Sequence, residues 1–146
     1  MVYYIILSDE TTYSHVVGYP MPLSTQFPEA SPGPIDAADV HLWAGENSGD
    51  LYIIKDDVVY QYVFGGIEEL LIKFTKSFSI TSTDDHVFNA VPQSPPQMPS
   101  GITALHISSV NGKSYAFVGS ELYVHQLGTG TWSYQGKVTC SVDEDI

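Results

Sequence analysis

Short apolar runs alternate with short polar segments along most of the chain. β-Branched and aromatic residues dominate the runs, and turn-forming residues dominate the segments between them, a pattern typical of antiparallel strands. Residues 40–74 break into four such runs, separated by a loop at 45–50, a tight turn at Asp56-Asp57 and a two-residue turn at Gly65-Gly66. This predicts a four-stranded meander, although its last run, 67–74, also fits an amphipathic helix.

One phrase recurs three times: an apolar run, a polar turn, then Tyr-x-Tyr or Tyr-x-His. The copies span Tyr4–His15, Tyr52–Tyr62 and Tyr115–His125. A repeat of this kind indicates stacked copies of one small unit, none of which buries its apolar face alone. The last copy has the same plan as the second, with turns at Asn111-Gly112, Gly119-Ser120 and 128–130.

Proline-rich segments at 19–34 and 91–99 separate the copies. Because proline is excluded from central strands, we interpret them as connectors, with a Pro-rich linker or SH3-type ligand as the alternative. The chain ends in a strand-like run, Lys137–Val142, followed by an acidic tail. We expect this run to pair beside the N-terminal strands, which would close a circular fold and remove exposed sheet edges.

Residues 19–24 read YPMPLS, a Phe-Pro pair follows, and residues 35–38 read IDAA. Residues 55–57 then read KDD, and residues 59–62 read VYQY. This series of motifs resembles that of the hemopexin-like propeller family, which has Lys-Gly-Asp and Tyr-Trp-Arg-Tyr at the last two positions. The resemblance implies an all-β fold, a small β-propeller, forming a single domain over residues 1–146. The implied repeats span about 137–146 plus 1–30, then 35–90, then 102–136.

The chain also departs from that family. It offers three clear repeats instead of four, Cys140 has no second cysteine to pair with, and the family's arginine is replaced by Gln61, Val124 or Ser14. The blade count therefore stays open. A degenerate fourth unit in 76–91 would complete a compact ring, or a second subunit would complete an open one, which makes a homo-oligomer one of the alternatives.

Composition narrows the classes of partner. The net charge of -12 repels phosphate backbones and attracts metal cations or polyamines, or serves solubility alone. No apolar run is long enough for a transmembrane helix, so we expect no membrane insertion. The first residues read as a strand and not as a signal peptide, and a single cysteine forms no intrachain disulfide. These features fit the cytoplasm, or export without a recognisable signal.

No catalytic motif is present: the chain has no Gly-x-Ser-x-Gly, His-Glu-x-x-His or phosphate-loop sequence, and no carboxylate pair stands out. We expect no enzyme activity. The scattered histidines and the single propeller also argue against haem. The family resemblance implies a channel lined by backbone carbonyls, holding structural calcium or another hard cation, with a water-filled channel as the alternative. The corresponding residues here are Asp36, Ala38, Thr103 and Leu105.

The repeated aromatic pairs suggest binding sites. Alternate residues of a strand face the same side, so each Tyr-x-(Tyr/His) pair shares one face. Such pairs could form equivalent shallow pockets for sugars, or they could wedge neighbouring sheets together. Two tryptophans are further stacking candidates. The candidate ligand-binding residues are Tyr13, His15, Trp43, Tyr60, Tyr62, Tyr123, His125 and Trp132.

The leading functional prediction is a lectin-like, multivalent, non-catalytic carbohydrate-binding protein. One alternative is an albumin-like storage or scaffold protein of the hemopexin-like fold that binds polyamine or calcium. The other is a self-assembling structural protein. The aromatic repeats favour the first, and the acidity favours the second.

Overall fold

The structure, a computed structural model, describes residues 5–7, 13–15, 22–43, 48–65, 71–80, 88, 98–126 and 132–139, with the backbone alone at 5–7, 13–15 and 71. The chain divides into two compact units, Met1–Pro34 and Ile35–Ile146. The described part is mostly strand, which confirms the all-β prediction. No closed propeller is shown.

The first unit contains a hairpin and two short helices. Strands β1 (Ile5–Leu7) and β2 (Tyr13–His15) pair antiparallel, as the first copy of the repeated phrase predicts. Helices α1 (Leu23–Gln26) and η1 (Pro28–Ala30) lie in the proline-rich connector. Within the described residues, no helix has the length and apolar character needed to cross a membrane.

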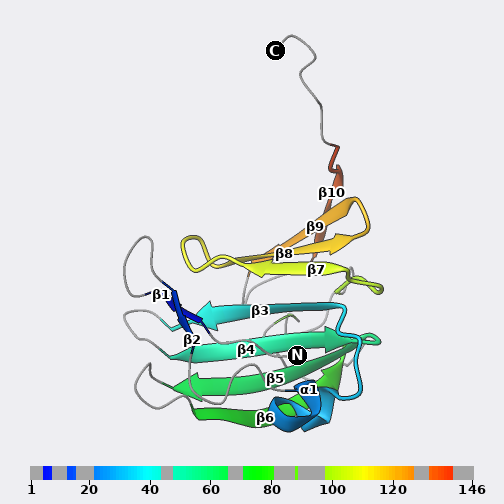
Figure 1. The fold of residues 1–146 in the computed structure, drawn as a ribbon. Coiled ribbons are helices and arrows are strands. Elements are labelled where there is room, and N and C mark those ends of the chain that lie inside the picture. The colour runs from blue at the N-terminus through cyan, green and yellow to red at the C-terminus, as the bar shows by residue number, and fades with distance from the viewer. Residues whose placement is uncertain are drawn as a thin grey trace, which may run out of the picture. The chain divides into compact units, whose positions relative to one another are not determined.

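The second unit begins with a four-stranded antiparallel sheet, here called the first sheet (Figure 1). Its order is β3-β4-β5-β6, so the predicted meander is confirmed. The ambiguous last run is a strand from Leu71, and it continues through Lys76–Ser79, which therefore do not begin a separate fourth unit. The strands are β3 (Ala37–Leu42), β4 (Gly49–Lys55), β5 (Val58–Gly65) and β6 (Leu71–Ser79).

The second sheet repeats this plan, in the order β7-β8-β9-β10. Lys137 ends its last strand by pairing with Glu121, and the Val138 N–H donates to the Ser120 carbonyl at 2.8 Å. The expectation that 137–142 pairs beside the N-terminal strands is therefore wrong for these two residues, and 140–142 lie outside the described part. The strands are β7 (Ala104–Ile107), β8 (Lys113–Val118), β9 (Glu121–Gln126) and β10 (Ser133–Lys137).

Tight turns set the register of both sheets. Asp56 and Asp57 have φ of 50° and 59°, so both central residues of the β4–β5 turn are left-handed. This is the type I′ geometry that matches the twist of paired strands. The corresponding β8–β9 turn has Gly119 at φ 59°, where glycine avoids the steric cost of a side chain.

One face of each sheet contributes to a shared apolar core. Tyr52, Ile54 and Val59 of the first sheet are at most 1% exposed. β3 and β7 lie side by side (Figure 1), and the Asp39 Oδ2 atom on β3 accepts the Ile107 N–H of β7 at 2.6 Å. The rest of the core cluster is Ala37, Ile80, Phe88, Met98, Ile102, Leu105, Ile107, Ala116 and Trp132.

A second polar link joins the β4–β5 turn to the segment that leads into β7. The Asp57 carboxylate accepts the Gly101 N–H at 2.9 Å and the Ser100 hydroxyl. The pKa of Asp57 is lowered by the Gly101 hydrogen bond first and the Ser100 hydrogen bond second. Both bonds favour the charged form, so the charged carboxylate stabilises the folded state.

We therefore expect Asp57→Asn to lower the free energy of unfolding at neutral pH by about 0.5–1 kcal/mol. This value is near the lower end of the range for hydrogen bonds, because the turn lies close to solvent. Because the folded pKa lies below 3.8, the contribution is present above that pH and is lost as the pH falls through the folded pKa. Urea unfolding from neutral to acid pH measures it.

Asp56→Asn is the matched control, because Asp56 lies in the same turn with the same sign of φ and its carboxylate accepts no hydrogen bond from the described residues. Equal losses in the two variants, or a difference that persists in acid, would show that the Asp57 link adds nothing to stability.

Candidate functional site

Trp43 follows the last residue of β3, and its side chain is 38% exposed. The indole Nε1–H donates to Asp50 Oδ2 at 2.9 Å, and the other carboxylate oxygen accepts from the Gln61 side-chain amide at 3.2 Å. The Trp43 backbone N–H donates to the Ser48 carbonyl at 3.0 Å, which anchors the residue itself. The ring is therefore held in place at the surface.

Sheet register explains why these groups gather. His41 is paired with Asp50, and Tyr52 is paired with Gln61, so all four share the face of the first sheet that carries the core. Tyr52 is buried, whereas His41, Asp50 and Gln61 are partly exposed. We call Trp43, His41, Asp50 and Gln61 the Trp43 site; it forms the polar end of an otherwise apolar face.

The electrostatics of the site come mainly from Asp50. Burial raises the pKa of the neighbouring Tyr52 well above its ordinary value of 10.0, and the charge of Asp50 raises it further. An ionised carboxylate offers about four lone-pair sites, and Trp43 and Gln61 use two of them. The Asp50 carboxylate therefore keeps the capacity to accept hydrogen bonds from a ligand.

Three of the predicted aromatic site residues are core residues. Tyr62 packs edge-to-face on Phe74 at 5.4 Å between ring centroids. His125 stacks on Trp132 at 4.9 Å, and the Trp132 Nε1–H donates to the Phe88 carbonyl at 3.1 Å. Tyr62, His125 and Trp132 are each 1% exposed, so none of them presents a surface for a ligand in this structure.

The remaining predicted residues are placed differently. Tyr60 and Tyr123 are partly exposed, and the Tyr123 ring packs on Tyr134 at 5.2 Å. Tyr13 and His15 lie on β2, but their side chains are outside the described part. The structure therefore brings neither Tyr60 nor Tyr123 to the Trp43 site.

The second sheet does not repeat the Trp43 site. In the strand alignment of the two sheets, the positions of Trp43, Asp50 and Gln61 correspond to Val110, Lys113 and Val124. The stacking ring, the carboxylate and the amide are all replaced. Between these two sheets, then, the site is single and not one of a set of equivalent pockets.

Two of the residues predicted to line an ion channel, Asp36 and Thr103, anchor hairpin turns through their side chains. Asp36 Oδ2 accepts the Asp56 N–H at 2.9 Å, and Thr103 Oγ1 accepts the Gly119 N–H at 3.1 Å. These are corresponding positions in the two sheets, so the same device anchors both hairpin turns. Sequence reasoning missed this role, although the match between IDAA at 35–38 and ITAL at 102–105 was the available signal.

The other two channel residues are strand residues. Ala38 is exposed on β3, and Leu105 is buried on β7. In the described ranges, no three His, Cys, Asp or Glu side chains are grouped so that they could hold a metal ion. Coordination of calcium by backbone carbonyls therefore stays a prediction.

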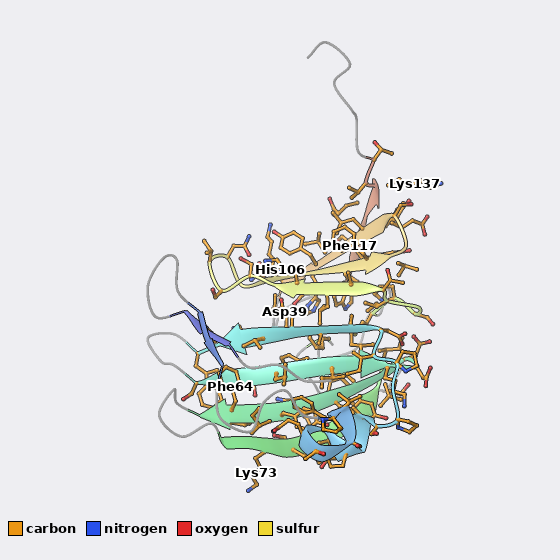
Figure 2. All side chains as sticks on the ribbon, in the orientation of Figure 1. Asp39, Phe64, Lys73, His106, Phe117 and Lys137 are labelled. Carbon is orange, nitrogen blue, oxygen red and sulfur yellow. The ribbon has the colours of Figure 1, made fainter. Side chains whose placement is uncertain are left out.

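A shallow hollow of about 390 Å³ lies on the second sheet, lined by His106, Ser108, Tyr115 and Phe117. The His106 and Tyr115 rings stack with centroids 6.0 Å apart, and His106 Nδ1 lies 3.2 Å from Asp39 Oδ2 on β3 (Figure 2). Sequence reasoning missed this surface as well. The alternation of aromatic residues at 115 and 117 was the signal.

In comparisons with known proteins, the chain matches no protein-family model, no curated protein and no solved structure. The resemblance to hemopexin-like propellers therefore stays an interpretation of the motifs in the chain itself.

The two tryptophans should behave oppositely. Trp132→Ala empties a core position and is expected to cost about 3–5 kcal/mol of unfolding free energy. Trp43→Ala removes a partly exposed ring and should cost about 1 kcal/mol or less. Urea unfolding measures both, with the circular dichroism of each variant compared first. Similar losses for the two variants would contradict the burial of Trp132 and the exposure of Trp43.

Proposed function

We propose that this chain is a non-catalytic carbohydrate-binding protein and that the Trp43 site binds the sugar. One observation carries the proposal: an exposed indole is fixed by a carboxylate that retains free acceptor sites. An aromatic face suits the apolar face of a pyranose ring, and a ring held in place loses little further freedom on binding.

The polar groups of the site match the hydroxyls of a sugar. Asp50 accepts from hydroxyl groups, the Gln61 amide both donates and accepts, and His41 offers two ring nitrogens for hydrogen bonds. All three lie on the sheet face beside the ring. Because the site is small and open, we expect weak binding to a single sugar residue, and any multivalency must come from several copies of the chain.

For the fold we propose a small propeller of hemopexin-like blades. Each sheet is a meander that starts at β3 or β7, and these two strands lie side by side. The repeated turn anchors, Asp36 and Thr103, support a common blade design. Three blades, a ring with a degenerate fourth blade, and a ring completed by a second subunit all remain compatible with this arrangement.

The second candidate function is the binding of polyamine or calcium by an albumin-like storage or scaffold protein. The net charge of -12 favours it, because such a field concentrates small cations. The Asp36–Asp56–Asp57 region is the acidic end of the first sheet, although the Asp36 and Asp57 carboxylates already bind the backbone N–H groups of Asp56 and Gly101. We rank this function second for that reason.

A glycan array probed with the intact chain, with and without chelator, tests the leading proposal. We expect binding to at least one class of glycan. A fluorescence titration with that glycan should then show an about two- to tenfold loss of affinity in Trp43→Ala, since an aromatic contact contributes about 0.5–1.5 kcal/mol. Leu42→Ala is the matched control, because Leu42 is the neighbouring exposed apolar residue, at 45% exposure, and its side chain is on the opposite face.

Two results would contradict the proposal. One is a blank array together with a rise in melting temperature on adding spermine or calcium, which would favour the cation-binding alternative, because a ligand of the native state raises its stability. The other is glycan binding that Leu42→Ala and Trp43→Ala reduce equally.

A further inference from the structure

The second sheet has one face in the core and one outer face. The outer face carries His106, Lys113, Tyr115, Phe117, Leu122 and Val124, which the register places on one side of β7, β8 and β9. Tyr115, Phe117, Leu122 and Val124 are all partly exposed, and Tyr115 and Phe117 also line the hollow of about 390 Å³. This is a contiguous, mostly apolar surface, of the kind that marks an interaction site.

The first sheet shows what such a face accommodates. Tyr115, Phe117 and Leu122 correspond in register to Tyr52, Ile54 and Val59. The latter three are at most 1% exposed, because the second sheet packs over them. The outer face therefore has the residue pattern of a sheet-packing surface, but its side chains stay partly exposed.

Charge indicates what could cover it. The chain carries a net charge of -12, which opposes contact between copies over most of the surface. Where the first sheet has Asp39, Asp50 and Gln61 on this face, the second has His106, Lys113 and Val124. No acidic residue of the second sheet occupies a described position on the outer face, and the Asp39 carboxylate beside it lies 3.2 Å from His106 Nδ1. This surface of an acidic protein therefore presents a low barrier to self-association.

The burial of residues on the first sheet also indicates how two copies of the chain could face each other. Head-to-tail stacking would place the outer face against the non-core face of another first sheet. On that face Ile53 and Tyr62 are 2% and 1% exposed, so they are already covered within their own chain. The remaining possibility is that the outer face of one copy packs against the outer face of a second copy. This is the arrangement of a two-fold dimer.

We propose that two copies of this chain dimerise through the outer face of the second sheet. The face is about 20 Å on a side, from the spacing of four strands and the rise per residue. That is below the roughly 800 Å² per partner of a standard interface, so the dimer is weak and depends on concentration. Because added salt screens the repulsion between the acidic chains, it strengthens the dimer. The proposal is independent of sugar binding, although a dimer would present two Trp43 sites. It applies to the open arrangement of the sheets, because the next blade of a closed ring would cover this face.

Sedimentation equilibrium of the full chain, from micromolar to millimolar concentration, tests this. We expect the mass to rise from the 16.0 kDa of one chain toward twice that value, and to rise at lower concentration in added salt. Phe117→Asp should weaken the dimer tenfold or more by placing facing carboxylates in it. The control Val110→Asp adds the same charge at a residue that is 95% exposed in the β7–β8 turn, and it should leave the dimer unchanged.

The double variant Leu122→Thr/Val124→Thr provides a second test in case Phe117→Asp misfolds. Threonine keeps a strong strand preference, so this variant should fold. It should also weaken the dimer, with unchanged circular dichroism. A monomer at all concentrations, assemblies larger than a dimer, or a dimer that persists in folded Phe117→Asp or in folded Leu122→Thr/Val124→Thr would each overturn the proposal.

Discussion

The apolar layer between the two sheets is the contact on which the rest of the second unit depends. Two four-stranded sheets of this size are marginal alone, because each has an apolar face that water would otherwise cover. Tyr52 and Ile54 from one side meet Leu105 and Ala116 from the other, and Trp132 closes the layer through its hydrogen bond to Phe88. The buried indole thus satisfies its one polar group while filling the largest volume in the layer.

Polar contacts at the rim of this layer set how the sheets meet. Asp39 binds a backbone N–H of β7, and Asp57 binds the segment before it. Both carboxylates satisfy backbone donors that no neighbouring strand pairs, which is the requirement at any sheet edge. The layer ends where Tyr52 gives way to Asp50, and there the Trp43 site begins. The position of the proposed sugar site is therefore a consequence of where the core stops.

Much of the fold could be predicted from the sequence. Short alternating runs and paired turn residues indicate meanders, and the Asp56-Asp57 turn lies where the polar dipeptide predicts it. The type of segment 67–74 could not be decided, because its apolar spacing fits both periods, and only the pairing of the part from Leu71 with β5 selects the strand. The end of the chain was misjudged at Lys137, since strand propensity does not say which neighbour a strand will pair with.

The site was predictable only in part. Trp43 was a candidate by residue type, and Trp132 was an equal candidate, because composition cannot distinguish an exposed ring from a buried one. Asp50 and Gln61 are far from each other in sequence and meet only through the register of β4 and β5. The prediction of equivalent pockets assumed that repeats with the same strands also carry the same binding side chains. Val110 and Lys113 show that the second copy keeps the strands and changes the side chains.

Hydrogen exchange of the two indole N–H groups, followed by NMR, tests the central claim most directly. If the apolar layer between the sheets is as described, the Trp132 resonance persists in heavy water as long as the most protected strand amides, because its N–H is buried and bonded to Phe88. The Trp43 resonance exchanges quickly beside its exposed carboxylate partner. Equally rapid exchange of both would show that no sealed layer joins the sheets.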